Sequence, residues 1–269
     1  MTPSKIPLYF DQKARTMSKY ESQIIEIVNL RGSISVLDLA HELQVSDQTI
    51  RRVVKPLVER GDISKVHGAL VSNRSALDPP FLARMSQNRA AKIAIAREVA
   101  RLVKDGDSIA IDTGSTSGFA AQALRERKNL TVVTNSAFVA STLAMIPGNN
   151  VSMAGTQLRD HDGAAFDRSA FEVIERMQVD YALLSASVVD AQKGFLVHEQ
   201  CEVDIATAMM RNASRTIMAV DASKFSPQDR RPAMRQPNLR SGDILVTDRP
   251  VPAGFEMITA SLTIIVAHS

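Results

Sequence analysis

Helix-like segments alternate with short apolar runs from residue 90 to residue 266. This alternation is typical of a mainly parallel α/β sheet. The predicted strands are 108–111, 130–133, 151–154, 181–184, 216–220, 244–246 and 263–266, and the predicted helices are 90–103, 137–145, 171–177 and 203–210. Because such sheets bind ligands at the carboxyl ends of their strands, the loops at those ends are the places where a site is expected.

Composition excludes several classes of protein. A length of 269 residues, with 45% hydrophobic and 23% charged residues, predicts one or two globular domains and excludes global disorder. A single cysteine excludes a disulfide framework, and five histidines without metal-ligand spacing lead us to expect neither metal nor cofactor. Residues 1–19 lack a signal-peptide core, and no apolar run approaches the ~18–20 residues of a membrane helix. We therefore expect a soluble, cytoplasmic protein without a membrane partner.

The first 75 residues contain three helix-like segments, each preceded by a serine that can cap it. These serines are Ser18, Ser35 and Ser46, and the third helix is predicted from Asp47 to Gly61. Two short helices joined by a tight link form a helix-turn-helix, whose second helix recognises DNA. Apolar runs at 63–66 and 69–71 predict a wing of two strands. The expected fold is a winged helix-turn-helix followed by a larger α/β effector domain.

Domain boundaries follow from the loss of helical spacing over residues 73–80, which end in Pro79-Pro80. Two prolines favour an extended connection. We predict a flexible N-terminal tail over 1–16, the winged helix-turn-helix over 17–72, a linker over 73–86 and the effector domain over 87–269.

The predicted DNA-binding groups lie at the start of the third helix and on the wing. Hydroxyls and backbone N–H groups there can bind phosphate, while Gln and Arg can reach base edges. The candidates are Ser46, Gln48, Thr49, Arg51 and Arg52 on the helix, with Lys65 and His67 on the wing. Residues 1–75 carry 11 Lys+Arg against 8 Asp+Glu, whereas residues 76–269 carry 21 of each. The alternative is a three-helix bundle with Arg51 and Arg52 on a solvated face.

Pro56 falls inside the predicted recognition helix. Proline removes one backbone donor and clashes with the preceding turn, so we predict a bend or a break near Val53–Pro56.

The segment from Ser33 to Ala69 closely resembles the DNA-binding domain of the DeoR family of bacterial transcription regulators. The matching residues are Leu39-Ala40, Leu43, Val45-Ser46, Thr49-Ile50-Arg51-Arg52, Leu57, Gly61 and His67-Gly68. The chain departs from the family pattern at Val53, where Asp is usual, and at Ala69, where Gly is usual. The resemblance implies binding to double-stranded operator DNA. Since paired recognition helices bind repeated half-sites, we expect a homo-oligomer, either a dimer or a dimer of dimers.

Four loops at predicted strand ends carry groups suited to a phosphorylated ligand. Residues 112–118 combine Gly114, which permits a tight turn, with three hydroxyls before a helix, although no Walker Gly-Lys-Ser/Thr follows. Residues 134–136 (Thr-Asn-Ser), Arg159 and Lys224 offer hydroxyl, amide and cationic partners. Taken singly, each of these features is equally consistent with an ordinary helix cap or a surface charge.

The order of these segments, continued by Thr247-Asp248, resembles the sensor domain of DeoR regulators, which is related to ribose-5-phosphate isomerase. The resemblance implies a phosphorylated sugar as effector. The residues implied at the effector site are Asp112, Gly114, Ser115, Thr116, Ser117, Thr134, Asn135, Ser136, Ser187, Glu202 and Lys224.

The competing hypothesis is a sugar-phosphate isomerase-like enzyme. Aldose–ketose isomerisation needs a carboxylate base, and the two acid positions of the isomerase pattern hold Ser187 and Asp190, so one acid is missing. Glu202, which matches a downstream acid, is interpreted as hydroxyl-binding or structural. We therefore predict no catalytic residues and a regulator, a repressor of a sugar or carbohydrate catabolic operon, that a phosphorylated sugar controls.

Two further features are less specific. Cys201 lies at the start of a predicted helix, where a helix N-terminus can lower a thiol pKa. The favoured interpretation is a buried structural cysteine or an incidental surface one. The basic, proline-rich run 230–240 predicts an exposed loop, a lid or an oligomer contact.

Overall fold

A computed structural model describes residues 19–31, 33–60, 62–66, 69–72, 81–225 and 233–268. Contacts divide the chain into two compact units, with the division at residues 74–75. The predicted tail 1–16, His67 and residues 73–80 of the predicted linker lie outside the described residues, whereas residues 81–86 of that linker are helical.

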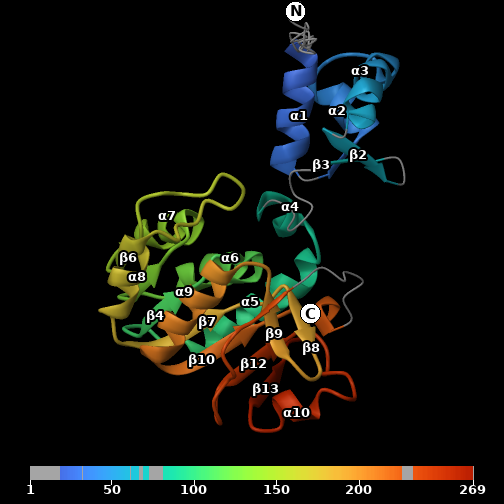
Figure 1. Ribbon diagram of the computed structural model, residues 1–269. Coiled ribbons are helices and arrows are strands. Elements are labelled where there is room, and N and C mark those ends of the chain that lie inside the picture. The colour runs from blue at the N-terminus through green and yellow to red at the C-terminus, as the bar shows by residue number, and fades with distance from the viewer. Residues whose placement is uncertain are drawn as a thin grey trace, which may run out of the picture. The chain divides into compact units, whose positions relative to one another are not determined.

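The N-terminal unit has the secondary structure of a winged helix-turn-helix (Figure 1). Its elements are α1 (Lys19–Arg31), β1 (Ser33–Ser35), α2 (Val36–Glu42), α3 (Asp47–Glu59), β2 (Ile63–Val66) and β3 (Ala69–Ser72). Within the described residues the strands form an antiparallel sheet in the order β1-β3-β2. The short strand β1 has no counterpart in the sequence prediction.

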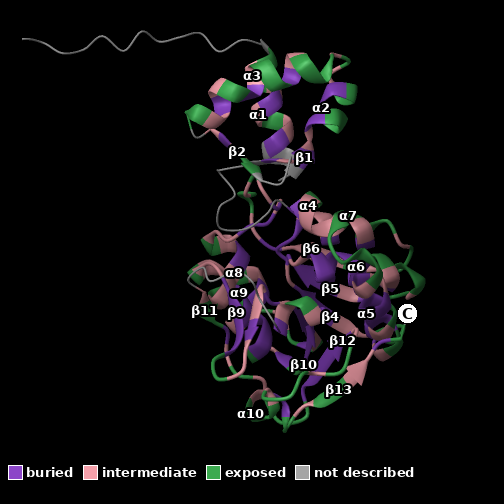
Figure 2. Cartoon of the chain, turned by 90° about the vertical axis from the view of Figure 1, so that its right-hand side faces the viewer, coloured by how far each residue is buried: buried purple, intermediate pink, exposed green. Residues whose placement is uncertain are grey.

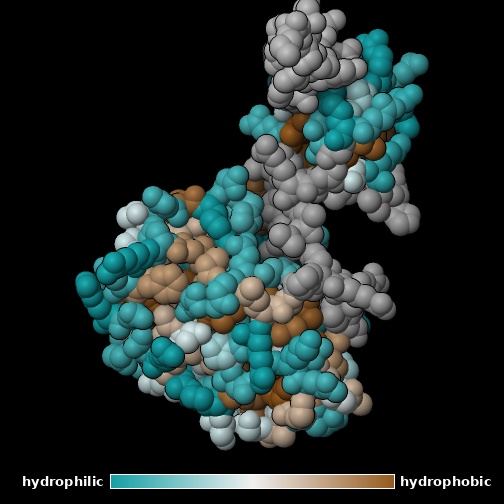
Figure 3. Space-filling view, in the orientation of Figure 1, coloured by the Kyte–Doolittle hydropathy of each residue, from teal (hydrophilic) through white to brown (hydrophobic). Residues whose placement is uncertain are grey.

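Helix caps and a small apolar core hold this unit together. Two of the three predicted caps are confirmed, because Ser35 Oγ accepts from Asp38 N at 3.0 Å and Ser46 Oγ accepts from Thr49 N at 3.2 Å. The third, Ser18, lies outside the described residues. The predicted inward face of α3 is also confirmed, since Ile50, Val54 and Leu57 are buried. Most of the described side chains of this unit that are visible in Figure 3 are hydrophilic.

The predicted helix break at Pro56 is wrong, because α3 continues without interruption from Asp47 to Glu59. Pro56 cannot donate to the carbonyl of Arg52, but Arg52 is exposed, so water can satisfy that oxygen. The next turn closes normally, with Arg60 N donating to Pro56 O at 3.1 Å.

The C-terminal unit is built on a parallel sheet, as predicted. Among the described residues it has seven strands in the order β13-β12-β10-β7-β4-β5-β6. Their bounds are β4 Ser108–Ile111, β5 Thr131–Thr134, β6 Asn150–Met153, β7 Val179–Leu184, β10 Ala213–Ala219, β12 Ile244–Thr247 and β13 Thr263–Val266. Every pairing between neighbours is parallel.

Helices cover both faces of this sheet, and alternate strand residues face opposite layers. The helices are α4 Phe81–Ser86, α5 Arg89–Leu102, α6 Ser115–Ala123, α7 Ala137–Ala144, α8 Arg168–Glu175, α9 Gln200–Arg211 and α10 Glu256–Thr259, with 3₁₀ turns η1 Leu124–Glu126 and η2 Ala222–Phe225. Ile109 and Ile111 pack in one core with α5, α6 and α7, whereas Ala110 packs in the other with α8 and α9. The central strands are accordingly mostly buried between the helical layers, whereas the edge strands β6 and β13 are not (Figure 2).

Strand order places a crevice between β4 and β7. The chain proceeds from β4 to β5 and β6 in one direction, and from β7 to β10, β12 and β13 in the other. Doubly wound sheets bind ligands where the order reverses in this way. A separate antiparallel sheet, in the order β11-β9-β8 among the described residues, comprises β8 Val188–Asp190, β9 Gly194–Val197 and β11 Met234–Arg235. The sequence prediction did not include it.

Candidate functional site

A cavity of about 230 Å³ lies at the carboxyl ends of the neighbouring strands β4 and β7. Its wall includes eight of the predicted effector residues, which are Asp112, Gly114, Ser115, Thr116, Asn135, Ser187, Glu202 and Lys224. Residues that the sequence prediction missed are also present, among them Arg84, Asn88, Lys92, Ser185, His198, Asp221 and Gln236.

Asp112 organises the loop between β4 and α6. One carboxylate oxygen accepts from Gly114 N at 3.0 Å and from the hydroxyl of Ser117. The other accepts from Ser185 N at 2.7 Å and Ser185 Oγ at 3.0 Å, which joins the ends of β4 and β7. Within the described chain no side chain caps α6. The first N–H groups of this helix therefore remain available to an anion at the cavity wall.

Gly114 is needed for a different reason from the predicted one. Its φ is −64°, which any residue can adopt, so a tight turn is not the cause. A Cβ at this position would lie 1.8 Å from Ser185 Oγ and 2.7 Å from Ser185 Cβ. Glycine thus permits the close approach of the β4 and β7 loops.

Three cationic side chains line the cavity together with the start of α6: Arg84, Lys92 and Lys224. Lys92 is only 3% exposed, and its Nζ donates to Arg84 O. Buried lysines are rare, because desolvation of the ammonium group is costly. A signal was present in the sequence: Lys92 occupies the helical face that continues through Ala96 and Val99, where an apolar residue is expected.

The same cavity contains buried acceptor oxygens without hydrogen-bond partners in the described structure. They are Asn135 Oδ1, Asp221 Oδ2 and Gln236 Oε1, in residues that are at most 3% exposed. Asn135 Nδ2 donates to Ala165 O at 3.0 Å, which leaves its oxygen as the unused group. Buried polar atoms are usually paired, so these oxygens indicate a place for ligand donors.

The structure places Ser117, Thr134 and Ser136 away from the cavity wall. The Ser117 hydroxyl contacts Asp112, and Thr134 Oγ1 donates to Ile111 O at 2.7 Å. Ser136 caps α7 by accepting from Val139 N at 3.4 Å. These hydroxyls support the loops that line the cavity.

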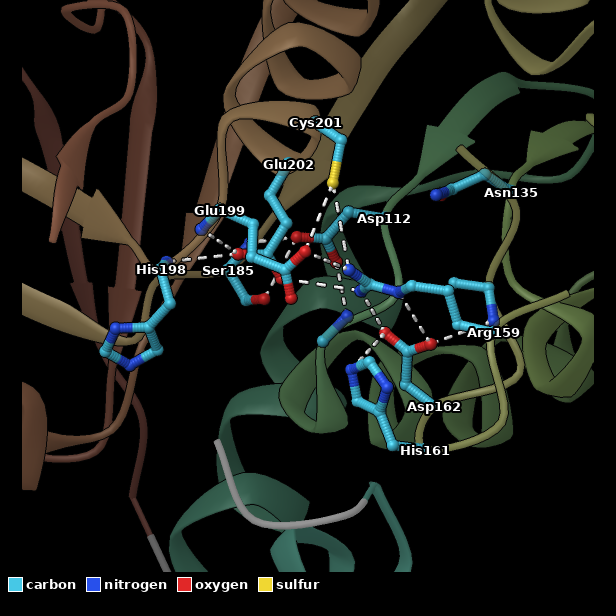
Figure 4. A network of polar contacts seen from close by, with 12 residues as sticks. Asp112, Asn135, Arg159, His161, Asp162, Ser185, His198, Glu199, Cys201 and Glu202 are labelled. Carbon is cyan, nitrogen blue, oxygen red and sulfur yellow. Dashed lines mark hydrogen bonds and ion pairs between the residues drawn. The ribbon is translucent and has the colours of Figure 1, made fainter. Parts of the chain in front are cut away.

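Glu202 connects the cavity to a network around Arg159. Its Oε2 accepts from the N–H groups of His198 and Glu199, each at 3.1 Å, which stabilises the start of α9. Glu199, Cys201 and Glu202 converge on the Arg159 guanidinium (Figure 4). Arg159 also forms a bidentate contact with Asp162. Its charge is therefore balanced within the protein, instead of facing a ligand as the sequence analysis considered.

The Cys201 thiol does not have the lowered pKa that was considered for a helix N-terminus. Burial raises its pKa to about 11, and the neighbouring carboxylates add to this effect while Arg159 opposes it. Burial is the largest cause of this rise in pKa, and the thiol also donates to Glu199 Oε2 at 3.6 Å, which favours its protonated form.

The start of α3 presents the predicted DNA-binding residues to solvent. Ser46, Gln48, Arg51 and Arg52 are exposed, Thr49 is half-buried, and Lys65 is exposed on β2. The Ser46 hydroxyl is 2.9 Å from Thr49 Oγ1, and Arg51 Nε lies 3.5 Å from Asp47 Oδ2. His67 lies outside the described residues.

Among the described residues, no helix is long and apolar enough to cross a membrane. In the same part of the chain, no group of three or more His, Cys, Asp or Glu side chains is arranged to hold a metal.

Comparison with known proteins gives matches to both units. Residues 21–76 match the model of the DeoR-like helix-turn-helix domain, and residues 87–249 match that of the DeoR C terminal sensor domain. The glycerol-3-phosphate regulon repressor of Escherichia coli K12 is 31% identical over 229 residues, covering 85% of this chain and 90% of that protein. The Haemophilus influenzae protein of the same name is 33% identical, covering 77% and 80%.

Among solved structures, ribose 5-phosphate isomerase A from Methanocaldococcus jannaschii is 22% identical with a TM-score of 0.38. The match covers 51% of this chain and 55% of that enzyme, so this chain spans about half its length. Nothing about function follows from that likeness.

The family matches, in contrast, confirm the prediction of a DNA-binding regulator and exclude the isomerase-like alternative. The chain belongs to the DeoR family of transcription regulators, with a helix-turn-helix DNA-binding domain followed by a sensor domain.

Proposed function

We propose that this regulator is a repressor of a carbohydrate catabolic operon and that a phosphorylated sugar bound in the cavity between β4 and β7 controls its binding to operator DNA. The observation that carries this proposal is the division of the cavity wall into two chemistries. Cations and uncapped helix N–H groups suit phosphate, and buried unpaired acceptor oxygens suit hydroxyl groups.

The phosphate subsite is assigned to the start of α6 with Lys92, Arg84 and Lys224. The N–H groups of Ser115 and Thr116 point along the helix axis toward its positive end, which favours an anion. A buried ammonium such as Lys92 gains more from a phosphate than an exposed one does, because solvent screens it less.

The hydroxyl subsite is assigned to the acceptor oxygens. Asn135 Oδ1 and Asp221 Oδ2 accept but cannot donate, so they match sugar O–H groups and repel phosphate oxygens. Glu202 and Ser187 also line the cavity. This arrangement favours a polyol carrying one phosphate over a free anion.

The name of one group of relatives supports a phosphorylated polyol as effector, because the Escherichia coli and Haemophilus influenzae proteins are glycerol-3-phosphate regulon repressors. We propose residues 17–72 as the DNA-binding domain, with Ser46, Gln48, Thr49, Arg51, Arg52, Lys65 and His67 at the DNA, and 87–269 as the sensor. A homo-oligomer, a dimer or a dimer of dimers, would place paired α3 helices on repeated half-sites.

The test is a titration of the purified protein on its own upstream DNA at stated salt concentration, with and without glycerol 3-phosphate, ribose 5-phosphate and fructose 6-phosphate. We expect specific binding and a change in affinity with at least one of these compounds. Binding to DNA that none of a broad panel of sugar phosphates alters would contradict the effector assignment.

A further inference from the structure

Gln236 reaches the cavity from a segment that the sequence analysis interpreted as an exposed loop. It follows β11, whose pairing with β9 holds Met234 opposite Val197 and Arg235 opposite Leu196. Gln236 N donates to Phe195 O at 3.0 Å and extends this attachment. As a result Gln236 is only 3% exposed and lines the cavity, so the expectation of an exposed loop is wrong at this residue.

The orientation of the Gln236 amide follows from its contact with β7. Nε2 donates to the main-chain oxygen of Ser185 at 2.8 Å. A carbonyl oxygen can only accept, so the NH₂ group must be the side of the amide that faces Ser185. Oε1 therefore points away from that contact, and it has no hydrogen-bond partner in the part of the chain that the structure describes.

A buried acceptor without a partner is unfavourable, and a ligand that supplies a donor relieves this cost. Phosphate oxygens carry lone pairs and negative charge, so they do not suit Oε1. A hydroxyl group does. The contact with Ser185, whose N and Oγ in turn donate to Asp112, fixes the position of the Gln236 amide at the cavity wall.

We propose that Gln236 is a specificity-determining residue of the effector site, whose Oε1 accepts a hydrogen bond from a hydroxyl group of the bound sugar phosphate. This inference rests on the proposed function of the cavity. It adds that Gln236 recognises a hydroxyl group of the effector. Gln236 selects for the hydroxylated carbon chain and contributes little to the binding of phosphate itself.

The experiment measures binding by calorimetry to the full-length protein and to Gln236→Met, which keeps the side-chain length but removes the amide. The probes are glycerol 3-phosphate, ribose 5-phosphate, fructose 6-phosphate, n-propyl phosphate and inorganic phosphate. We expect Gln236→Met to bind the preferred sugar phosphate roughly 10- to 100-fold more weakly, while its affinity for inorganic phosphate and n-propyl phosphate changes less than about twofold. Gln178→Met is the matched control, because Gln178 is exposed and lies outside the cavity. This control variant should bind the sugar phosphate, n-propyl phosphate and inorganic phosphate as the wild type does.

Thermal unfolding establishes whether Gln236→Met is folded. If it is not, Gln236→Asn replaces it, since the shorter side chain withdraws the acceptor but keeps the amide, and the same selective loss is expected. Equal affinity of the wild type and the folded variant for the preferred sugar phosphate would overturn the inference and leave the proposed function intact. A wild-type protein that binds no sugar phosphate would overturn the proposed function, and this inference with it.

Discussion

Single residues at the β4–β7 crevice are constrained by close approach more than by backbone conformation. Gly114 shows this, since an added Cβ would meet Ser185 Oγ at 1.8 Å. We predict that Gly114→Ala destabilises the protein by roughly 1–3 kcal/mol, the usual effect of overpacking. It should also weaken effector binding, because Ser185 must move away from Asp112. Thermal unfolding and effector titration measure the two effects.

The matched control for this prediction removes the other partner in the clash. In Gly114→Ala combined with Ser185→Gly, the added methyl group has the space of the missing side chain, so part of the stability should return. A Gly114→Ala protein as stable as the wild type would show that the crevice can widen freely.

We predict that the charge of Lys224 contributes to effector binding and does not contribute to operator binding. Lys224→Ala should weaken effector binding by roughly 10- to 100-fold, as expected for a lost charged hydrogen bond, and leave operator affinity in the absence of effector unchanged. Calorimetry and an operator titration check the two parts. Lys193→Ala serves as control, because Lys193 is exposed and does not line the cavity. An unchanged effector response would remove Lys224 from the site.

Cys201 is predicted to be chemically inert near neutral pH. With its pKa raised to about 11, the thiol stays protonated well above the usual range, and alkylation should accelerate only as the pH approaches that value. The unfolded chain, whose thiol has an ordinary pKa, should react much faster at pH 8. The same shift lowers stability as the pH rises from about 9 to 11, because only the unfolded state loses its proton there. Rapid labelling of the folded protein at pH 7 would contradict this account.

At the scale of elements, the helix α3 combines an inward apolar face with an outward polar one. Ile50, Val54 and Leu57 are buried, whereas Arg51 and Arg52 point to solvent beside them. We predict that Arg51→Ala with Arg52→Ala lowers operator affinity at least about a hundredfold and leaves effector affinity unchanged. Arg168→Ala is the control, as an exposed arginine on α8 of the sensor unit. Retained operator affinity in the double variant would contradict the assignment of α3 as the recognition helix.

Elements with a local signal could be predicted from the sequence, and elements made by distant pairing could not. The helix caps at Ser35 and Ser46 are local hydrogen bonds, and the strands of the large sheet are apolar runs, so both were found. The sheet β11-β9-β8 is built from strands of only two to four residues, and β11 pairs with β9 across a long separation in sequence, so no local pattern marks β11. Gln236 was missed for the same reason, since only the pairing of β11 with β9 brings it into the cavity.

Pro56 illustrates the opposite error. Its intrinsic preference against a helix interior is local and strong, yet α3 continues through it. The lost hydrogen bond falls at the carbonyl of exposed Arg52, and the next turn is anchored by buried Leu57. Tertiary packing of the inward face thus outweighs a single unfavourable residue.

At the scale of the whole molecule, regulation requires that effector binding and operator binding influence each other. By linkage, if the effector lowers operator affinity by some factor, bound operator must lower effector affinity by the same factor. A factor of roughly 5 to 150 corresponds to the coupling free energies usual for allosteric proteins. We predict a factor in this range, measured as effector affinity by calorimetry with and without saturating operator DNA.

A scrambled duplex of the same length and a stated salt concentration control this measurement, because non-specific binding to phosphates depends on salt rather than on sequence. The Arg51→Ala, Arg52→Ala protein supplies a second control, since it should bind the effector equally well with or without operator DNA. Equal effector affinity of the wild-type protein in both conditions would mean that the cavity ligand does not control DNA binding. In Lys224→Ala, effector affinity can fall by the same factor with and without operator DNA, so that the coupling factor is unchanged. That result would show that Lys224 contributes to effector binding only and that other residues couple the effector site to the DNA-binding domain.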